Sequence, residues 1–155
     1  MGTGKSAVGR LVAEHADAAF YDLDSMIESD AGMTVAEIFA TRGESAFRAI
    51  EFRLLPIALQ PGAVVALGGG TPMNESNWRL ITERATTFFL DVRFETIWRR
   101  VGATAKRPLA ANRSRGEVEA LLEERRPRYE QASHRVDADR PLDVVAAEVL
   151  KLWSA

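Results

Sequence analysis

Met1-Gly2-Thr3-Gly4-Lys5-Ser6 opens the chain and matches the second half of the phosphate-loop pattern G-x-x-x-x-G-K-[ST]. Glycines let backbone N–H groups approach phosphate oxygens, Lys5 is expected to reach the β- and γ-phosphates of a nucleotide, and Ser6 offers a hydroxyl to Mg²⁺. The helix expected from Ala7 onward adds its positive N-terminal end to the same site. The competing interpretation is a flexible glycine-rich tail with an incidental Gly-Lys-Ser.

Downstream of this loop, short apolar runs alternate with longer amphipathic segments. The expected strands cover residues 18–23, 63–67, 86–92 and 134–136, and the expected helices cover residues 7–15, 25–29, 35–42, 44–59, 77–84, 94–101, 116–131 and 142–153. Strands that alternate with helices predict an α/β fold of three layers, in which helices cover both faces of a parallel sheet. Ligands of such folds bind at the carboxyl ends of the strands.

The first glycine of the phosphate-loop pattern is absent, and so is the strand that should precede the loop. In folds of this kind that strand lies at the centre of the sheet. About five or six buried apolar side chains, at ~1.5–3 kcal/mol each, would contribute more than ~8 kcal/mol, against a typical net stability of ~5–15 kcal/mol. We therefore expect the natural protein to begin upstream of Met1, and the chain as given to fold poorly.

The composition is that of one soluble globular domain, residues 1–155, with 46% hydrophobic and 27% charged residues. A net charge of -2 provides no basic field for nucleic acid or an anionic membrane. No apolar run approaches the roughly 18 residues of a membrane span, and the first residues do not form a signal peptide. The absence of cysteine excludes disulfides and thiolate sites, and His15 and His134 alone disfavour a histidine metal site. A cytoplasmic enzyme or binding domain remains.

Two carboxylates, Asp22 and Asp24, mark the end of the first expected strand. Spaced two residues apart on a strand they would share a face, and like charges this close oppose each other's ionisation unless a cation or hydrogen-bond donors lie nearby. We assign Asp22 to the Mg²⁺ shell, through water, and Asp24 to hydrogen bonds with a substrate hydroxyl. The alternative for Asp24 is the N-cap of a helix over residues 25–29.

The glycine triplet Gly68-Gly69-Gly70 directly follows a buried strand. Three consecutive glycines cost backbone entropy, and a turn needs only one or two, so close approach of the backbone to a ligand is the more economical explanation. Residues 102–115 form a basic, irregular segment that is either a mobile surface loop or a lid. As a lid it would bring Arg107 to the charge that develops on a transferred phosphoryl group, and would exclude water.

Several arginines also stand out. Arg48 and Glu51 lie at i, i+3 on the helix expected over residues 44–59, where an ordinary surface ion pair is the default interpretation. Arg125 and Arg126 could likewise be a solvated helix face. Together they attract interest because arginine is suited to gripping a carboxylate with two hydrogen bonds.

In order along the chain, these segments resemble the shikimate kinase family from Met1 to about Trp153. Six pieces carry the resemblance: Met1–Ser6, Asp22-Leu23-Asp24, Gly43-Glu44 with Phe47-Arg48 and Glu51, residues 67–70, Arg107-Pro108-Leu109, and Arg125 with Pro127 and Tyr129. Each piece alone is a weak signal, but six in order at family-like spacing form a strong one.

The resemblance implies transfer of the γ-phosphoryl of ATP to the 3-hydroxyl of shikimate, with Mg²⁺. It also implies a five-stranded parallel sheet like that of nucleoside monophosphate kinases, with the first strand absent from this chain. By position, the catalytic residues would be Lys5, Asp24 and Arg107. ATP and its phosphates would be bound by Gly2, Thr3, Gly4, Lys5, Ser6, Ala7, Arg100 and Arg107. Shikimate would be bound by Asp24, Arg48, Gly68, Gly69, Gly70 and Arg125. The metal would be held by Ser6 and Asp22. The shikimate-binding helices would span about residues 25–59, and the lid about residues 102–115.

The chain departs from the family where Ala138 stands in place of a common Thr, which leaves the adenine contacts open, and where Arg128 replaces an apolar residue. One rival is another small-molecule kinase of this class, such as a gluconate or nucleotide kinase. Another is a catalytically inactive nucleotide-binding domain. The resemblance further implies a monomer that binds ATP and shikimate, while the composition and net charge predict a cytoplasmic protein without nucleic acid or membrane partners.

Overall fold

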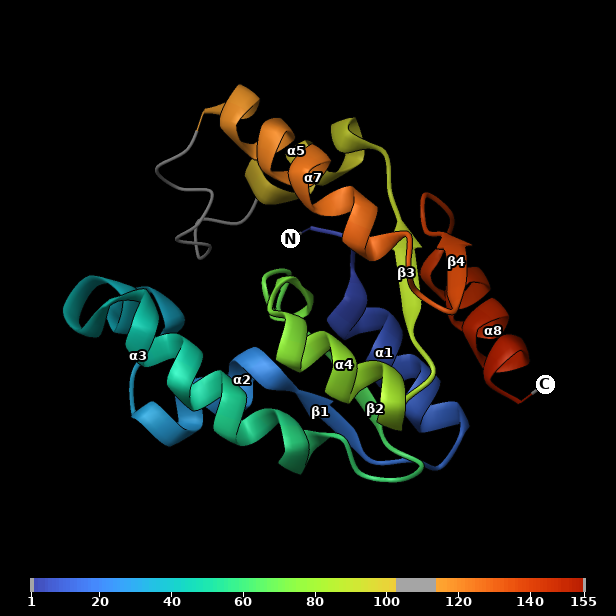
Figure 1. Cartoon of the computed structure of the whole chain (residues 1–155). Helices are drawn as coiled ribbons and strands as arrows, with labels where there is room; N and C mark the ends of the chain where they lie inside the picture. The colour runs from blue at the N-terminus through green and yellow to red at the C-terminus, as the bar shows by residue number, and fades with distance from the viewer. Residues whose placement is uncertain (1, 103–113, 155) are drawn as a thin grey trace.

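The structure is a computed structural model that describes residues 2–102 and 114–154 (Figure 1). The elements in chain order are α1 (Lys5–His15), β1 (Phe20–Asp22), α2 (Leu23–Ala31), α3 (Val35–Ala58), β2 (Val64–Ala66), the 3₁₀ turn η1 (Thr71–Met73), α4 (Glu75–Arg84), β3 (Phe88–Asp91), α5 (Phe94–Gly102), α7 (Arg115–Tyr129), β4 (His134–Asp137) and α8 (Leu142–Trp153). Within the described residues, none of these helices has the length and apolar character needed to cross a membrane.

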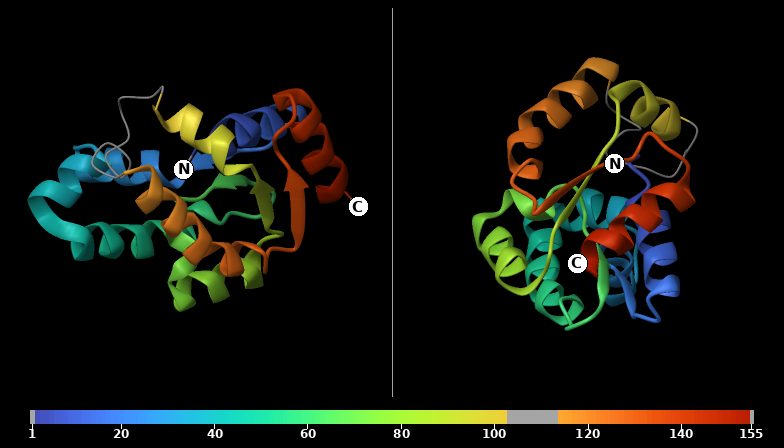
Figure 2. Two further views of the ribbon diagram at one scale, coloured as in Figure 1. Left: turned by 90° about the horizontal axis from the view of Figure 1, so that it is seen from above. Right: turned by 90° about the vertical axis from the view of Figure 1, so that its right-hand side faces the viewer.

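Helices pack on both faces of the strands, which confirms the predicted three-layer α/β arrangement (Figures 1 and 2). One hydrophobic cluster joins α1 and α8 to β3 and β4 and includes the buried Val12. The other joins α2, α3 and α4 to β1 and β2 and includes the buried Leu55. Neighbouring residues of β2 serve different clusters, Val64 the first and Val65 the second. This alternation is the one expected of a strand between two layers.

The four strands form two parallel pairs, β1 with β2 and β3 with β4. Tyr21 lies opposite Val65 in the first pair, and Leu90 lies opposite Val136 in the second. Among the described residues, β2 and β3 are not hydrogen-bonded to each other. Both strands instead line a cavity of about 1330 Å³ that also reaches Lys5.

The long helix α3 confirms two predicted helices that meet at Gly43. Gly43 has φ 78 and ψ 172, a left-handed conformation that glycine adopts without steric cost, and it interrupts the helical backbone. The first part of α3 begins with a capping box, in which Thr34 and Glu37 satisfy each other's backbone N–H groups. The second part therefore starts in a direction of its own and carries Arg48.

The acidic segment differs from the prediction. β1 ends at Asp22 and α2 begins at Leu23, so Asp24 lies in the first turn of a helix and does not share a strand face with Asp22. Asp22, not Asp24, is the N-cap, because its Oδ1 accepts the N–H of Ser25 at 3.3 Å. The strand period fails here because this cap starts the helix two residues earlier than expected.

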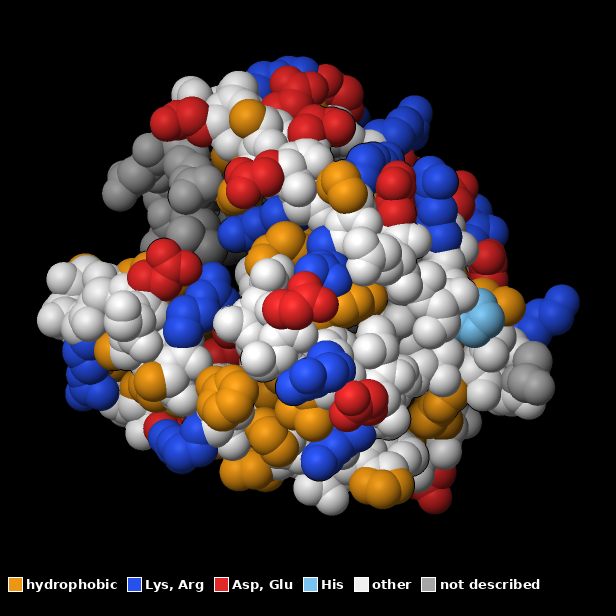
Figure 3. All heavy atoms as spheres, in the orientation of Figure 1, with side chains coloured by type: hydrophobic (Ala, Val, Ile, Leu, Met, Phe, Trp, Pro, Cys, Tyr) orange, Lys and Arg blue, Asp and Glu red, His pale blue; other side chains and the backbone are white. Residues whose placement is uncertain are grey.

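Charges of both signs are interspersed over the face shown in Figure 3, with no large patch of one sign. The most exposed large apolar side chains, Phe52 and Ile57, lie on α3. A mixed surface of this kind agrees with the small net charge of the chain.

Candidate active site

The loop before α1 forms a backbone cradle. Gly2 and Gly4 have φ of 69 and 84, in the left-handed region that favours glycine. Gly4 precedes the first helical residue, and its carbonyl accepts the N–H of Val8 at 2.9 Å. The unpaired N–H groups of the first helical turn and the positive helix end point in one direction, which is the arrangement that binds phosphate.

Beside the cradle, the Ser6 hydroxyl donates to Asp22 Oδ2 at 2.5 Å. These two oxygen-bearing side chains come from the start of α1 and the end of β1. Mg²⁺ prefers oxygen ligands and is usually held by one or two protein groups together with substrate phosphates and water. The pair therefore fits such an ion. Within the described residues, no group of three or more His, Cys, Asp or Glu side chains is placed to hold a metal by itself.

Asp24 is half-buried against the glycine turn. A Cβ atom on Gly68 would lie only 2.8 Å from Asp24 Oδ1, so glycine is needed for this approach. Burial raises the pKa of Asp24, Lys5 opposes this shift, and Asp22 and Glu51 add to it. A raised pKa makes the carboxylate a stronger acceptor for a hydroxyl proton.

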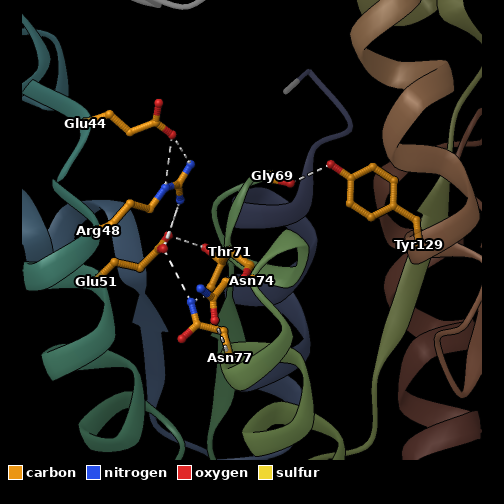
Figure 4. A network of polar contacts seen from close by, with 8 residues as sticks. All are labelled: Glu44, Arg48, Glu51, Gly69, Thr71, Asn74, Asn77 and Tyr129. Atoms are coloured by element: carbon orange, nitrogen blue, oxygen red, sulfur yellow. Dashed lines mark hydrogen bonds and ion pairs between the residues drawn. The ribbon is translucent and has the colours of Figure 1, made fainter.

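Arg48 is held by two carboxylates (Figure 4). Its Nη1 donates to both oxygens of Glu51 at 3.0 and 2.9 Å, and its Nη2 lies 3.2 Å from Glu44 Oε1. Burial alone would lower the pKa of Arg48, but the bonds to Glu51 and Glu44 raise it overall. Since Glu51 is only 1% exposed, the expectation of an ordinary surface ion pair is wrong.

Glu51 also bonds to two residues that sequence reasoning missed. Its Oε1 accepts the Thr71 hydroxyl at 2.6 Å, and its Oε2 accepts Asn77 Nδ2 at 3.4 Å. Thr71 and Asn77 are both buried. One signal could have indicated that Glu51 is buried, although not which residues contact it: Glu51 occupies the helical face that Phe47 and Leu55 share, one turn away on either side.

The glycine turn lies between these groups and α7. A Cβ atom on Gly70 would meet Arg48 Nη2 at 2.5 Å. From the other side, the Tyr129 hydroxyl donates to the Gly69 carbonyl at 2.7 Å. Arg125, one helical turn before Tyr129, is half-buried and interacts with the Tyr129 phenol. The predicted substrate residues Asp24, Arg48 and Arg125 thus lie around the glycine triplet or next to a residue that contacts it.

The other predicted residues divide into three groups. Arg100 Nη1 donates to the Gly2 carbonyl at 3.2 Å, which places Arg100 at the phosphate loop. Arg126 pairs with Asp91 at 3.1 Å, so its role here is in an ion pair at the end of β3. Lys106, Arg107, Pro108 and Leu109 lie outside the described residues, as does most of the predicted lid.

A phosphate cradle, an adjoining hydroxyl–carboxylate pair and an arginine held beside a glycine turn, on a parallel α/β fold, define a phosphate-loop kinase of a small molecule. The sequence profile described as "Shikimate kinase" matches residues 1–153. The chain belongs to the shikimate kinase family.

Individual relatives agree with the profile. The shikimate kinase of Salinibacter ruber is 36% identical, and the match covers 100% of this chain and 81% of that protein. The solved shikimate kinase from Aquifex aeolicus superposes with a TM-score of 0.85 at 34% identity, covering 97% of this chain and 90% of that one. The Acinetobacter baumannii shikimate kinase, solved in complex with shikimate, gives a TM-score of 0.91 at 29% identity, covering 98% and 87%. The chain is thus an ATP-dependent kinase, a phosphotransferase.

Proposed function

We propose that this chain transfers the γ-phosphoryl of ATP to the 3-hydroxyl of shikimate, giving shikimate 3-phosphate and ADP. The observation that carries the proposal is the grouping of Asp24, Arg48 and the Tyr129-bearing end of α7 around one glycine turn. Shikimate is a small anionic polyol, whose carboxylate suits arginine and whose hydroxyls suit a carboxylate acceptor. Phosphoryl transfer needs little beyond positioning and charge stabilisation.

Each residue has a stated role in this reaction. The cradle and Lys5 bind the β- and γ-phosphates, and Asp24 accepts the proton of the attacking hydroxyl. Arg48 and Arg125 bind the shikimate carboxylate. Mg²⁺, held by Ser6 and Asp22, would supply neutralisation of the phosphate charge. Arg107, Arg100 and Ala7 complete the proposed nucleotide contacts, and residues 102–115 form the proposed lid.

The proposed setting follows the family resemblance. The chain is proposed to act as a single domain over residues 1–155 and as a monomer in the cytoplasm. Its proposed partners are ATP and shikimate. The small net charge of -2 supports the proposal that nucleic acid is not among them.

A coupled ADP-release assay with Mg²⁺ and ATP tests the function, with shikimate, gluconate and nucleoside monophosphates compared as acceptors. The assay uses the 155-residue chain and a form extended upstream of Met1. Shikimate-dependent turnover that Lys5→Ala abolishes is the expected result. Faster turnover of gluconate or a nucleotide would favour the rival kinases. A folded protein with no turnover in either form would indicate an inactive nucleotide-binding domain.

A further inference from the structure

The central peptide of the glycine turn is held by a residue far away in the sequence. The Gly68 carbonyl accepts the N–H of Thr71 at 3.1 Å, and the Gly70 carbonyl accepts the N–H of Met73 at 3.1 Å. The turn thus fixes two of its own carbonyls. The third carbonyl, that of Gly69, accepts the hydroxyl of Tyr129 at 2.7 Å (Figure 4).

This contact also sets the direction of a neighbouring donor. The Gly69 carbonyl and the Gly70 N–H belong to one trans peptide, and the two groups of a trans peptide point to opposite sides. The Gly70 N–H has no hydrogen-bond partner among the residues that the structure describes. Gly70 packs against the Arg48 guanidinium. The Gly70 N–H is therefore a neutral hydrogen-bond donor that lies next to the charged donors of Arg48.

A glycine triplet cannot hold this peptide by itself. Glycine has no preference for one backbone conformation, so the peptide between two glycines rotates at little steric cost. Tyr129 can hold it because its ring packs against Phe89 at 5.6 Å between centroids. Burial raises the pKa of Tyr129, and Arg125 opposes that shift. The phenol therefore remains a donor at neutral pH.

We infer that Tyr129 is a positioning residue whose hydroxyl fixes the Gly69–Gly70 peptide, so that the Gly70 N–H faces the proposed acceptor pocket, by which we mean the side of the glycine turn where Arg48 and Asp24 lie. Tyr129 acts through the backbone and does not itself touch the substrate. The inference rests on the proposed function in one respect, namely that shikimate is the occupant of this pocket.

Tyr129→Phe removes only the hydroxyl, and Tyr21→Phe is the matched control because the Tyr21 hydroxyl makes no hydrogen bond to any described residue. In the form of the protein that turns over shikimate, Tyr129→Phe is expected to raise the KM for shikimate about three- to tenfold. The KM for ATP should stay unchanged, and Tyr21→Phe should change neither constant. An unchanged shikimate KM in Tyr129→Phe, or an equal rise in both KM values, would overturn the inference.

A second readout does not depend on the substrate. Amide hydrogen exchange and the ¹⁵N chemical shift at Gly70 should change in Tyr129→Phe and remain constant in Tyr21→Phe. If the unaltered protein does not use shikimate, the proposed function fails, and the Gly70 amide alone decides the inference. A Gly70 amide that is identical in both variants contradicts it.

The chain has only two tyrosines, which allows a test without truncating the side chain. Fluorotyrosine incorporated into Tyr21→Phe protein labels position 129 alone, and ring fluorination lowers the phenol pKa because fluorine withdraws electrons. The groups facing this phenol are Arg125 on its own helix, the Gly69 carbonyl on the turn and the apolar Phe89 on β3. Since a phenolate cannot donate, the shikimate KM should rise with pH in this protein. It should not rise in labelled Tyr129→Phe protein, and equal profiles in the two would overturn the inference.

Discussion

Glu51 provides the sharpest test of how the acceptor pocket is built. Its carboxylate is 1% exposed and accepts hydrogen bonds from Arg48, Thr71 and Asn77. Glu51→Gln keeps the shape but replaces one acceptor oxygen with an amide that must face one of these donors. Arg48 also loses the buried negative charge with which it pairs. A hydrogen bond to a charged group contributes ~1.5–3 kcal/mol, and breaking a buried ion pair costs ~3–5 kcal/mol.

We therefore expect Glu51→Gln to lower the free energy of unfolding by ~2–3 kcal/mol, and Glu51→Ala by more. The measurement is urea denaturation followed by circular dichroism and by tryptophan fluorescence, whose transitions must coincide for the free energies to be valid. The KM for shikimate should rise in parallel, because Arg48 would no longer be held at the pocket.

Glu44→Gln is the matched control, since Glu44 bonds to the same Arg48 but its side chain is 64% exposed. An exposed pair at i, i+4 contributes only ~0.3–0.5 kcal/mol, so this variant should unfold almost like the parent. If both variants lose the same stability, or if Glu51→Gln loses less than ~0.5 kcal/mol, burial is not what gives Glu51 its importance.

Three further outcomes are expected. Asp24→Asn should abolish shikimate-dependent turnover yet raise the melting temperature at neutral pH. The reason is that burial raises the pKa of Asp24 in the folded protein above the unfolded value near 3.8. The ionised carboxylate therefore lowers stability as the pH rises through the folded pKa, and the gain in melting temperature should shrink near pH 4. Gly70→Ala should raise the shikimate KM about tenfold or more, because its Cβ would lie 2.5 Å from Arg48 Nη2. Gly116→Ala, in α7 with no atom within 4 Å of the added Cβ, should leave kinetics unchanged and add up to ~1 kcal/mol of stability. Chemical denaturation and steady-state kinetics check all three.

The features of the site that could be predicted depend on short-range patterns. Gly-Lys-Ser predicts the cradle before α1, and the pairing of Ser6 with Asp22 follows because the start of α1 lies beside the carboxyl end of β1. The break in α3 at Gly43 could also be predicted from residues 35–59 alone. In these cases the local chemistry allows few alternatives.

The features that could not be predicted depend on packing between distant segments. The residues near Glu51 in the sequence do not indicate that Thr71 and Asn77 donate hydrogen bonds to its carboxylate, since these partners lie 20 and 26 residues away. The contact from Tyr129 to Gly69 spans 60 residues. The helix start at Leu23 was missed for a different reason. The residue pattern predicts that the strand continues, but the Asp22 side chain caps a helix that begins at Leu23.

Asp22 uses its two carboxylate oxygens separately, Oδ2 for the Ser6 hydroxyl and Oδ1 for the Ser25 N–H. The second contact works only for a short side chain, because an N-cap must fold back onto backbone three residues ahead. Glutamate has the same charge but one more methylene, which carries the carboxylate away from that N–H. Asparagine has the right length but no charge. Position 22 is therefore constrained by side-chain length for folding and by charge for chemistry. Asp22→Glu, usually regarded as a mild substitution, should lower the melting temperature more than Asp22→Asn does.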